Sequence, residues 1–157
     1  MAQDQQRKTE HFTFVAKVKP GRGNVIREKA KERDKMAWAD IDKLLRPLTL
    51  HYARWLLFDN DTRFIYYASF DTDMDRYIDD AARIFAESGV AGFFPDLEGF
   101  PDSEASAGDP EAYRKFLRDN KVDAFSKFEG YPGVTVEEIK KAVKVRNAFS
   151  SMLDEMQ

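Results

Sequence analysis

Residues 50–85 constrain the fold more than any other part of the chain. Two segments rich in aromatic and aliphatic residues, Leu50–Asp59 and Arg63–Asp71, flank a polar turn at Asn60-Asp61. This arrangement is typical of two antiparallel strands joined by a short connection. Directly afterwards, Asp71-Thr72-Asp73 offers capping oxygens to an amphipathic helix over Met74–Glu87. The sequence therefore predicts a strand–strand–helix unit.

A further strand and a long charged helix precede this unit. Alternating apolar residues predict a strand over His11–Lys19, and the charge-rich stretch Asn24–Leu45, closed by Pro47, predicts one helix. The order strand–helix–strand–strand–helix favours an α+β fold, a ferredoxin-like sandwich with an antiparallel sheet. Enzymes, sensors and binding modules all use this scaffold, so the expected fold alone does not name a reaction.

Extra elements are expected after the strand–helix–strand–strand–helix unit. Residues 89–109 are rich in Gly, Pro and acidic residues, which predicts an irregular loop with solvated acids that is a lid, a binding loop or disordered. A helix over Pro110–Asn120 and a last strand over Val122–Phe128 follow. The C-terminal helix begins at Thr135, where Thr135 and Glu138 fit a capping box.

Composition indicates one packed domain. The chain has 157 residues, of which 43% are apolar and 13 are Phe, so we expect a single domain over residues 11–157 behind a disordered lead-in at 1–10. The net charge is only −3 and the basic residues are interleaved with acidic ones, which argues against a nucleic-acid partner. No run approaches the length of a membrane span and no apolar leader is present, so we expect a cytoplasmic protein without a membrane partner.

The supply of metal ligands is small. The chain contains no Cys and two His, which excludes disulfides, thiolate metal sites and a three-histidine zinc site within one chain. No metal site is predicted, and the sequence requires no cofactor.

One face of the predicted sheet is expected to meet the helices and the other to be free. Strand alternation assigns to the helix side Phe12, Phe14, Trp55, Phe64, Tyr66 and Phe70. It assigns to the open side Val15, Lys17, Tyr52, Arg54, Leu56, Ile65, Tyr67 and Ser69. An apolar face of this extent needs a partner. We therefore expect a homodimer in which two sheets pair and enclose a lumen.

Three phrases of the chain resemble a known group of proteins. They are residues 50–55 (Leu-His-Tyr-Ala-Arg-Trp), residues 67–71 (Tyr-Ala-Ser-Phe-Asp) and residues 130–136 (Gly-Tyr-Pro-Gly-Val-Thr-Val). With the order of elements, they resemble the ferredoxin-like dimeric α/β-barrel superfamily, and most closely an uncharacterised domain family associated with catalase- and peroxidase-like proteins. Thr72 departs from the pattern, which carries Gly there. The resemblance implies a dimeric barrel and a function related to oxidoreductases or monooxygenases.

The open face supplies the candidate ligand-binding residues, which are Arg54, Tyr52, Tyr67, Ser69 and Lys17. A buried guanidinium needs a carboxylate, a phosphate or an aromatic partner. Arg54 therefore either binds an anionic small molecule, or pairs with Asp71 or Glu129 inside the protein, or stacks on a tyrosine.

Three functions are open at this point. The first is a small-molecule pocket on the open sheet face or in the dimer lumen. The second is a non-catalytic module that dimerises or docks onto a partner through Phe93, Phe94 and Phe100 of the long loop. The third is haem binding through His51. Strand alternation instead places His51 on the helix side, where backbone groups would satisfy it, and His11 is the weaker candidate ligand.

Overall fold

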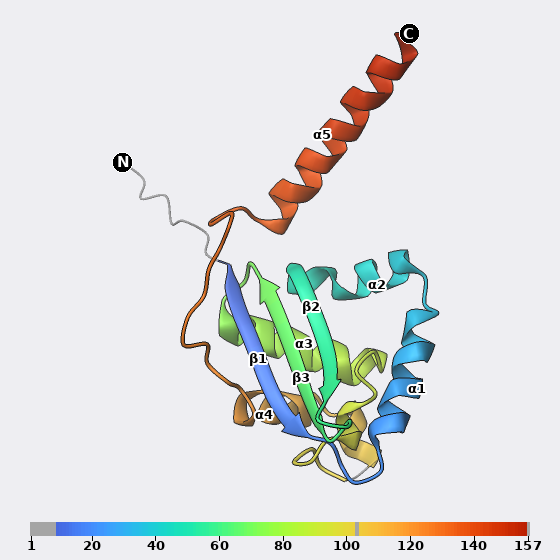
Figure 1. The fold of residues 1–157 in the computed structure, drawn as a ribbon, viewed down its shortest axis with the longest axis vertical. Helices are drawn as coiled ribbons and strands as arrows, with labels where there is room; N and C mark the ends of the chain where they lie inside the picture. The colour runs from blue at the N-terminus through green and yellow to red at the C-terminus, as the bar shows by residue number, and fades with distance from the viewer. Residues whose placement is uncertain (1–8, 103, 157) are drawn as a thin grey trace.

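The sheet consists of three antiparallel strands in the order β1-β3-β2, with β1 at Glu10–Lys17, β2 at Leu50–Phe58 and β3 at Arg63–Phe70 (Figure 1). The computed structural model describes residues 9–102 and 104–156. Most of the expected lead-in, residues 1–8, lies outside this range, whereas Glu10 already belongs to β1. The predicted α+β class with an antiparallel sheet is confirmed.

The predicted connection between β2 and β3 is confirmed as a tight turn. Asp59, Asn60 and Asp61 have positive φ values of 54°, 52° and 62°. Asp and Asn tolerate this conformation better than other non-glycine residues. The amide and the hydroxyl of Thr62 both donate to the carbonyl oxygen of Asp59, at 3.1 and 2.7 Å, and close the turn.

Five α-helices lie in the described residues, and the first two correct a prediction. They are α1 at Gly23–Asp34, α2 at Trp38–Leu45, α3 at Met74–Ser88, α4 at Pro110–Asp119 and α5 at Val136–Glu155. The single helix expected over residues 24–45 is divided because Ala37 is extended, with φ −62° and ψ 137°. The break redirects the chain, so that α2 lies beside the start of β2 and Leu44 and Leu45 pack on the core (Figure 1). A 3-10 turn, η1 at Arg46–Leu48, leads into β2.

Helices α3 and α4 cover one face of the sheet, whereas in the described part of the chain only the start of α5 borders the other face (Figure 1). The apolar stripe predicted for α3 is confirmed, since every member of it is buried: Tyr77, Ile78, Ala81, Ile84 and Phe85. Asp73 caps the helix by accepting from the amide of Arg76 at 3.0 Å. Because the helices use only one face, the alternation of β1 and β3 separates a buried aromatic side from an open side.

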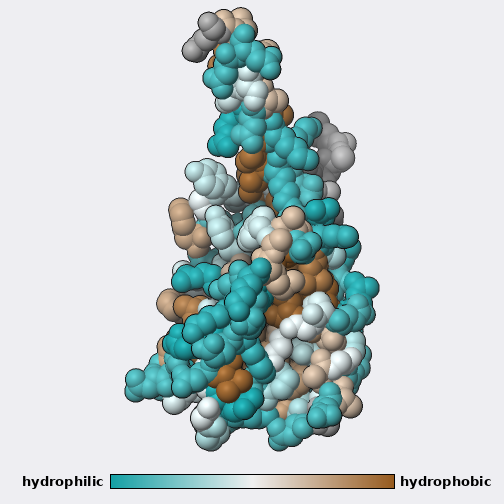
Figure 2. All heavy atoms as spheres, turned by 90° about the vertical axis from the view of Figure 1, so that its right-hand side faces the viewer, coloured by the Kyte–Doolittle hydropathy of each residue, from teal (hydrophilic) through white to brown (hydrophobic). Residues whose placement is uncertain are grey.

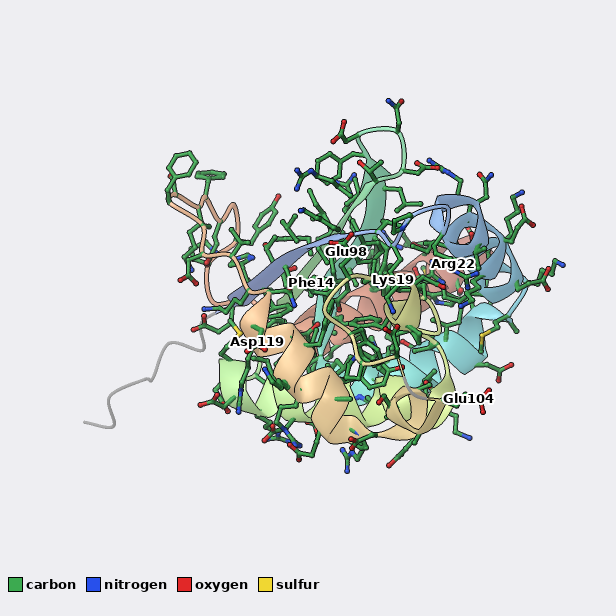
Figure 3. All side chains as sticks on the ribbon, turned by 90° about the horizontal axis from the view of Figure 1, so that it is seen from below. Phe14, Lys19, Arg22, Glu98, Glu104 and Asp119 are labelled. Atoms are coloured by element: carbon green, nitrogen blue, oxygen red, sulfur yellow. The ribbon has the colours of Figure 1, made fainter. Side chains whose placement is uncertain are left out.

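The phenylalanines of the segment 89–109 belong to the core, which overturns the docking role predicted for them. Phe93, Phe94 and Phe100 are 4%, 0% and 3% exposed. The ring of Phe94 contacts that of Phe14, with ring centroids 5.5 Å apart. Seen from below (Figure 3), Glu98 lies next to Lys19, where backbone hydrogen bonds join this segment to the end of β1 and the residues after it. The segment includes two 3-10 turns, η2 at Phe94–Asp96 and η3 at Glu104–Gly108.

The prediction of a strand over residues 122–128 is wrong. Within the described chain, a single bridge joins Lys121 to Phe14 of β1. Two backbone bonds flank it, from Val15 to Asn120 at 3.2 Å and from Val122 to Thr13 at 2.8 Å. The chain then leaves the sheet edge. Phe125 and Phe128 stay exposed, at 106% and 91%, because no surface formed by residues 9–102 and 104–156 covers them.

Helix α5 projects from the domain (Figure 1). Val136 is buried at its start, but the remaining members of the predicted apolar stripe are 41–56% exposed, namely Ile139, Val143, Phe149, Met152 and Leu153. Hydrophobic residues form a brown strip on the lower part of this helix in Figure 2. Among the described residues, no helix combines the length and the apolarity needed to cross a membrane.

Candidate binding site on the open face of the sheet

A cavity of about 480 Å³ lies where the open sheet face meets the start of α5. Its floor is formed by side chains of the three strands, including His11, Tyr52, Tyr67 and Ser69. The returning C-terminal segment supplies the opposite wall, including Phe128, Glu129, Tyr131, Val134 and Ile139. Residues that are distant in sequence thus form one hollow with aromatic walls and a few polar groups.

The strand register decides which predicted ligand-binding residues reach this cavity. Ser69 pairs with His11 on one side and Tyr52 on the other, which makes one row across the open face. Tyr67 occupies the next row, between Thr13 and Arg54. Three predicted residues, Tyr52, Tyr67 and Ser69, therefore line the cavity together.

The other two predicted residues lie outside the cavity. Arg54 is exposed in the row of Tyr67, beside the hollow but not in its lining. Among the described residues no ion pair involves Arg54, and its expected partner Asp71 binds His51 instead. Lys17 pairs with Arg63 at the far end of β1, so the structure does not bring it to this site.

His51 sits in a β-bulge, which corrects the helix-side environment expected for it. Leu50 pairs with Phe70 and Tyr52 with Ser69, so His51 is the extra residue between them. A bulge of this kind re-aims a side chain. Nε2 of His51 lies 2.6 Å from Oδ1 of Asp71, so a carboxylate and not the backbone satisfies the ring. For His51 to bind haem iron through Nε2, it would first have to release Asp71.

Asp71 also fixes the position of α5. Its second oxygen, Oδ2, accepts from the amide of Val136 at 2.7 Å. The predicted capping box is confirmed: the amide of Glu138 donates to Oγ1 of Thr135 at 3.3 Å, and the amide of Thr135 donates to Oε2 of Glu138 at 2.8 Å. The first turn of α5 is thus held over the cavity, although the rest of the helix projects.

His11, which sequence reasoning ranked as the weaker histidine, makes the most specific contact in the cavity. Its Nδ1 lies 3.0 Å from the hydroxyl of Tyr67, and its Nε2 lies 3.5 Å from Oε1 of Glu129. Strand alternation places His11 on the open face, but only the register brings it next to Tyr67. Glu129 also accepts from Nζ of Lys127 at 2.7 Å. Lys127 and then His11 lower the pKa of Glu129, which keeps its carboxylate charged.

A second cavity, of about 340 Å³, adjoins the first and lies between α1, α2, β2 and the start of α5. Hydrophobic side chains gather on this side of the molecule (Figure 2). The guanidinium of Arg33 stacks over Trp55, 4.3 Å from the ring centroid. His51 and Tyr52 line both cavities, so the bulge forms part of the wall between them.

The acidic residues do not form a metal site in the part of the chain that the structure describes. No group of three or more His, Asp or Glu side chains there has the geometry to hold a metal ion. Asp96, expected to be solvated, is instead 2% exposed. It accepts from Nε of Arg22 at 2.8 Å and from Nζ of Lys29 at 2.7 Å, so it joins η2 to α1.

Comparison with known proteins gives no assignment: no protein-family model matches the chain, and no curated protein matches it. Function is therefore inferred from the geometry of the site. The first cavity combines aromatic walls with an imidazole, a phenol and a hydroxyl, which are groups able to stack on a ring and to exchange hydrogen bonds.

Proposed function

We propose that this protein binds a small aromatic molecule in the cavity beneath the start of α5. The observation that carries this proposal is the convergence of Tyr52, Tyr67 and Ser69 with His11 in one hollow. Its volume of about 480 Å³ matches the roughly 300–1,000 Å³ of known small-molecule sites. Aromatic side chains on both walls would stack on a planar ring, and the polar groups would fix its orientation.

The charge around the cavity favours a ligand with an acidic group. Arg54 lies directly across from Tyr67 and is exposed, with no ion-pair partner among the described residues. A guanidinium binds carboxylates and other planar anions in a two-pronged geometry. An aromatic ring in the cavity would place its acidic substituent within reach of Arg54.

A second copy of the chain is the proposed cover for the open face. The element order, with residues 121–122 beside β1, supports a ferredoxin-like arrangement in which a rudimentary fourth strand extends the sheet. Tyr52, Leu56 and Phe58 on the open face are 73%, 36% and 40% exposed. Pairing two such faces would bury these side chains and enclose the cavity in the lumen of a dimeric barrel.

A second candidate function is a dimerisation module without chemistry. The exposed stripe of α5 favours it, since an amphipathic helix that leaves its apolar side uncovered is typical of an interaction element. This candidate requires no ligand in the cavity.

An oxygenase-related reaction is supported only by the resemblance in the sequence. The cavity itself supports binding of a ligand, and binding is therefore the activity proposed here.

The test measures, by saturation-transfer NMR, whether 4-nitrophenol binds saturably to the wild-type protein and to two variants. Ser69→Leu fills the floor of the cavity and should abolish binding. Thr13→Leu adds similar bulk to the same face, one row away and outside the lining, and should retain it. If the wild-type protein does not bind the probe, or if both variants lose it equally, the proposal is wrong.

A further inference from the structure

We propose that Tyr67, His11 and Glu129 form a proton relay that ionises the acidic hydroxyl of a phenol or an enol bound in this cavity. The inference rests on the proposed binding function and adds to it a chemical step and a ligand class. Three residues from β3, β1 and the segment before α5 take part, and all three line the cavity.

The first link is between the phenol and the imidazole. Tyr67 Oη and His11 Nδ1 are 3.0 Å apart, a hydrogen-bond distance, and the two rings are nearly parallel, with an interplanar angle of 25°. Both side chains are partly buried. A general base must lie within hydrogen-bond reach of the proton that it accepts, and His11 meets this requirement for the Tyr67 proton.

The second link orients the imidazole. Glu129 Oε1 faces the opposite nitrogen, Nε2, at 3.5 Å. Nε2 is buried, and the described residues offer it no hydrogen bond of good geometry. A carboxylate on that side favours the tautomer with the proton on Nε2, which leaves Nδ1 free to accept from Tyr67. Contacts of this kind often tighten when a ligand binds.

The proton count is simple. The bound hydroxyl gives its proton to Oη of Tyr67 while Tyr67 gives its own proton to Nδ1 of His11. The net result is a ligand oxyanion and an imidazolium that faces the Glu129 carboxylate. Only O–H and N–H bonds change, no electrons are transferred, and no co-reactant is required.

The charges around the relay favour the ionised ligand. Arg54 faces Tyr67 from β2, and Lys140, which also pairs with Asp42 at 3.2 Å, lines the cavity from α5. His51 lines the cavity as well and pairs with Asp71, and Lys127 pairs with Glu129. A cation close to a developing oxyanion stabilises it, whereas the carboxylates of Asp71 and Glu129 are each already engaged by a histidine.

The experiment measures the ionisation of bound 4-nitrophenol, because its phenolate absorbs visible light and the phenol does not. At a pH below the probe's own pKa, the wild-type protein should raise the phenolate-to-phenol ratio of the bound probe about tenfold, equivalent to one pKa unit. Tyr67→Phe and His11→Gln should abolish this increase while the dissociation constant changes only a few-fold. Glu129→Gln should reduce the increase, and Thr13→Val, beside Tyr67, should leave it intact.

The outcomes separate the two proposals. A probe that binds without added ionisation, or whose ionisation survives Tyr67→Phe and His11→Gln, overturns the relay and leaves the binding function standing. The absence of saturable binding to the wild-type protein overturns both. If His11→Gln fails to fold by circular dichroism, Tyr67→Phe, which removes one hydroxyl, decides the question alone.

Discussion

His51 and Asp71 meet in a 2.6 Å contact at the bulge of β2, and that contact ties the sheet to the C-terminal helix. The same carboxylate accepts the amide of Val136 through its other oxygen at 2.7 Å. Both side chains are largely buried, at 11% and 13% exposed. Because Asp71 satisfies a strand residue and a helix terminus together, it sets where α5 begins and thereby shapes the cavity wall.

Replacing Asp71 should therefore loosen α5 before it unfolds the domain. Asp71→Ala leaves His51 and the Val136 amide without their partner, which should lower the free energy of unfolding by about 1–3 kcal/mol. Hydrogen exchange at the first turn of α5 should accelerate. Asp75→Ala, whose side chain is 86% exposed in the first turn of α3, is the matched control: it should lower the free energy of unfolding by less than about 1 kcal/mol and leave exchange at α5 unchanged. Unchanged exchange in Asp71→Ala would show that α5 is held by other contacts.

The buried phenols of Tyr66 and Tyr77 should behave as a unit. Their hydroxyls lie 2.5 Å apart, and both rings are only 1% exposed. Burial raises the pKa of each hydroxyl above its ordinary value, so both stay protonated. Tyr77→Phe leaves the Tyr66 hydroxyl unpaired and should cost about 1–3 kcal/mol, whereas the double Phe variant should cost clearly less than the sum of the two single changes. Urea unfolding of the four proteins measures this coupling, and additive losses would contradict it.

Asp96 should contribute to stability through its ties to α1. Asp96→Asn removes the charge from hydrogen bonds with Arg22 and Lys29 and should cost about 1.5–3 kcal/mol in urea unfolding. Asp102→Asn tests the same segment at a carboxylate that is 89% exposed, and should cost less than about 1 kcal/mol. Equal losses in the two variants would mean that burial of Asp96 carries no special weight.

The proposed dimer depends on the open face. Leu56→Glu places a charge among the apolar side chains there and should convert a dimer to a monomer in sedimentation experiments. Met36→Glu is a fair control because Met36 is 41% exposed, close to the 36% of Leu56, and lies between α1 and α2. A wild-type protein that sediments as a monomer at micromolar concentration would exclude the sheet-paired dimer.

Glu129 gives the site a pH dependence whose sign follows from its lowered pKa. The ordinary value is 4.5, and Lys127 and His11 hold the folded value below it. The stabilisation from the charged carboxylate is therefore full above pH 4.5 and is lost as the pH falls through the folded pKa. In urea unfolding, the difference between wild type and Glu129→Gln should shrink as the solution is acidified. Glu155→Gln, exposed near the end of α5, should show no such trend.

Local signals in the sequence were sufficient wherever the structure depends on near neighbours. The turn at residues 59–61, the cap at Asp73, the capping box at Thr135 and the buried stripe of α3 all follow from residues within a few positions of one another. The alternation of β1 and β3 likewise predicted which side chains face the helices.

Long-range packing overrode the sequence pattern elsewhere. The loop 89–109 looks polar and irregular, yet Phe94 is fully buried because its ring completes the aromatic cluster around Phe14. Residues 122–128 have the composition of a strand, but their contact with β1 ends at Val122. The burial of Phe94 and the loss of strand pairing after Val122 both depend on residues that are distant in sequence. The local hydrophobic periodicity therefore does not predict either of them.

The sequence by itself determined the α+β class, the hairpin, the caps and the two faces of the sheet, because these follow from local conformational preferences and from the period of two along a strand. Only the tertiary structure decided the membership of the site. A one-residue bulge aims His51 at Asp71, and the register of β1 on β3 sets His11 beside Tyr67. Register and bulges depend on how whole strands pair, and that pairing is settled by the packing of the entire domain.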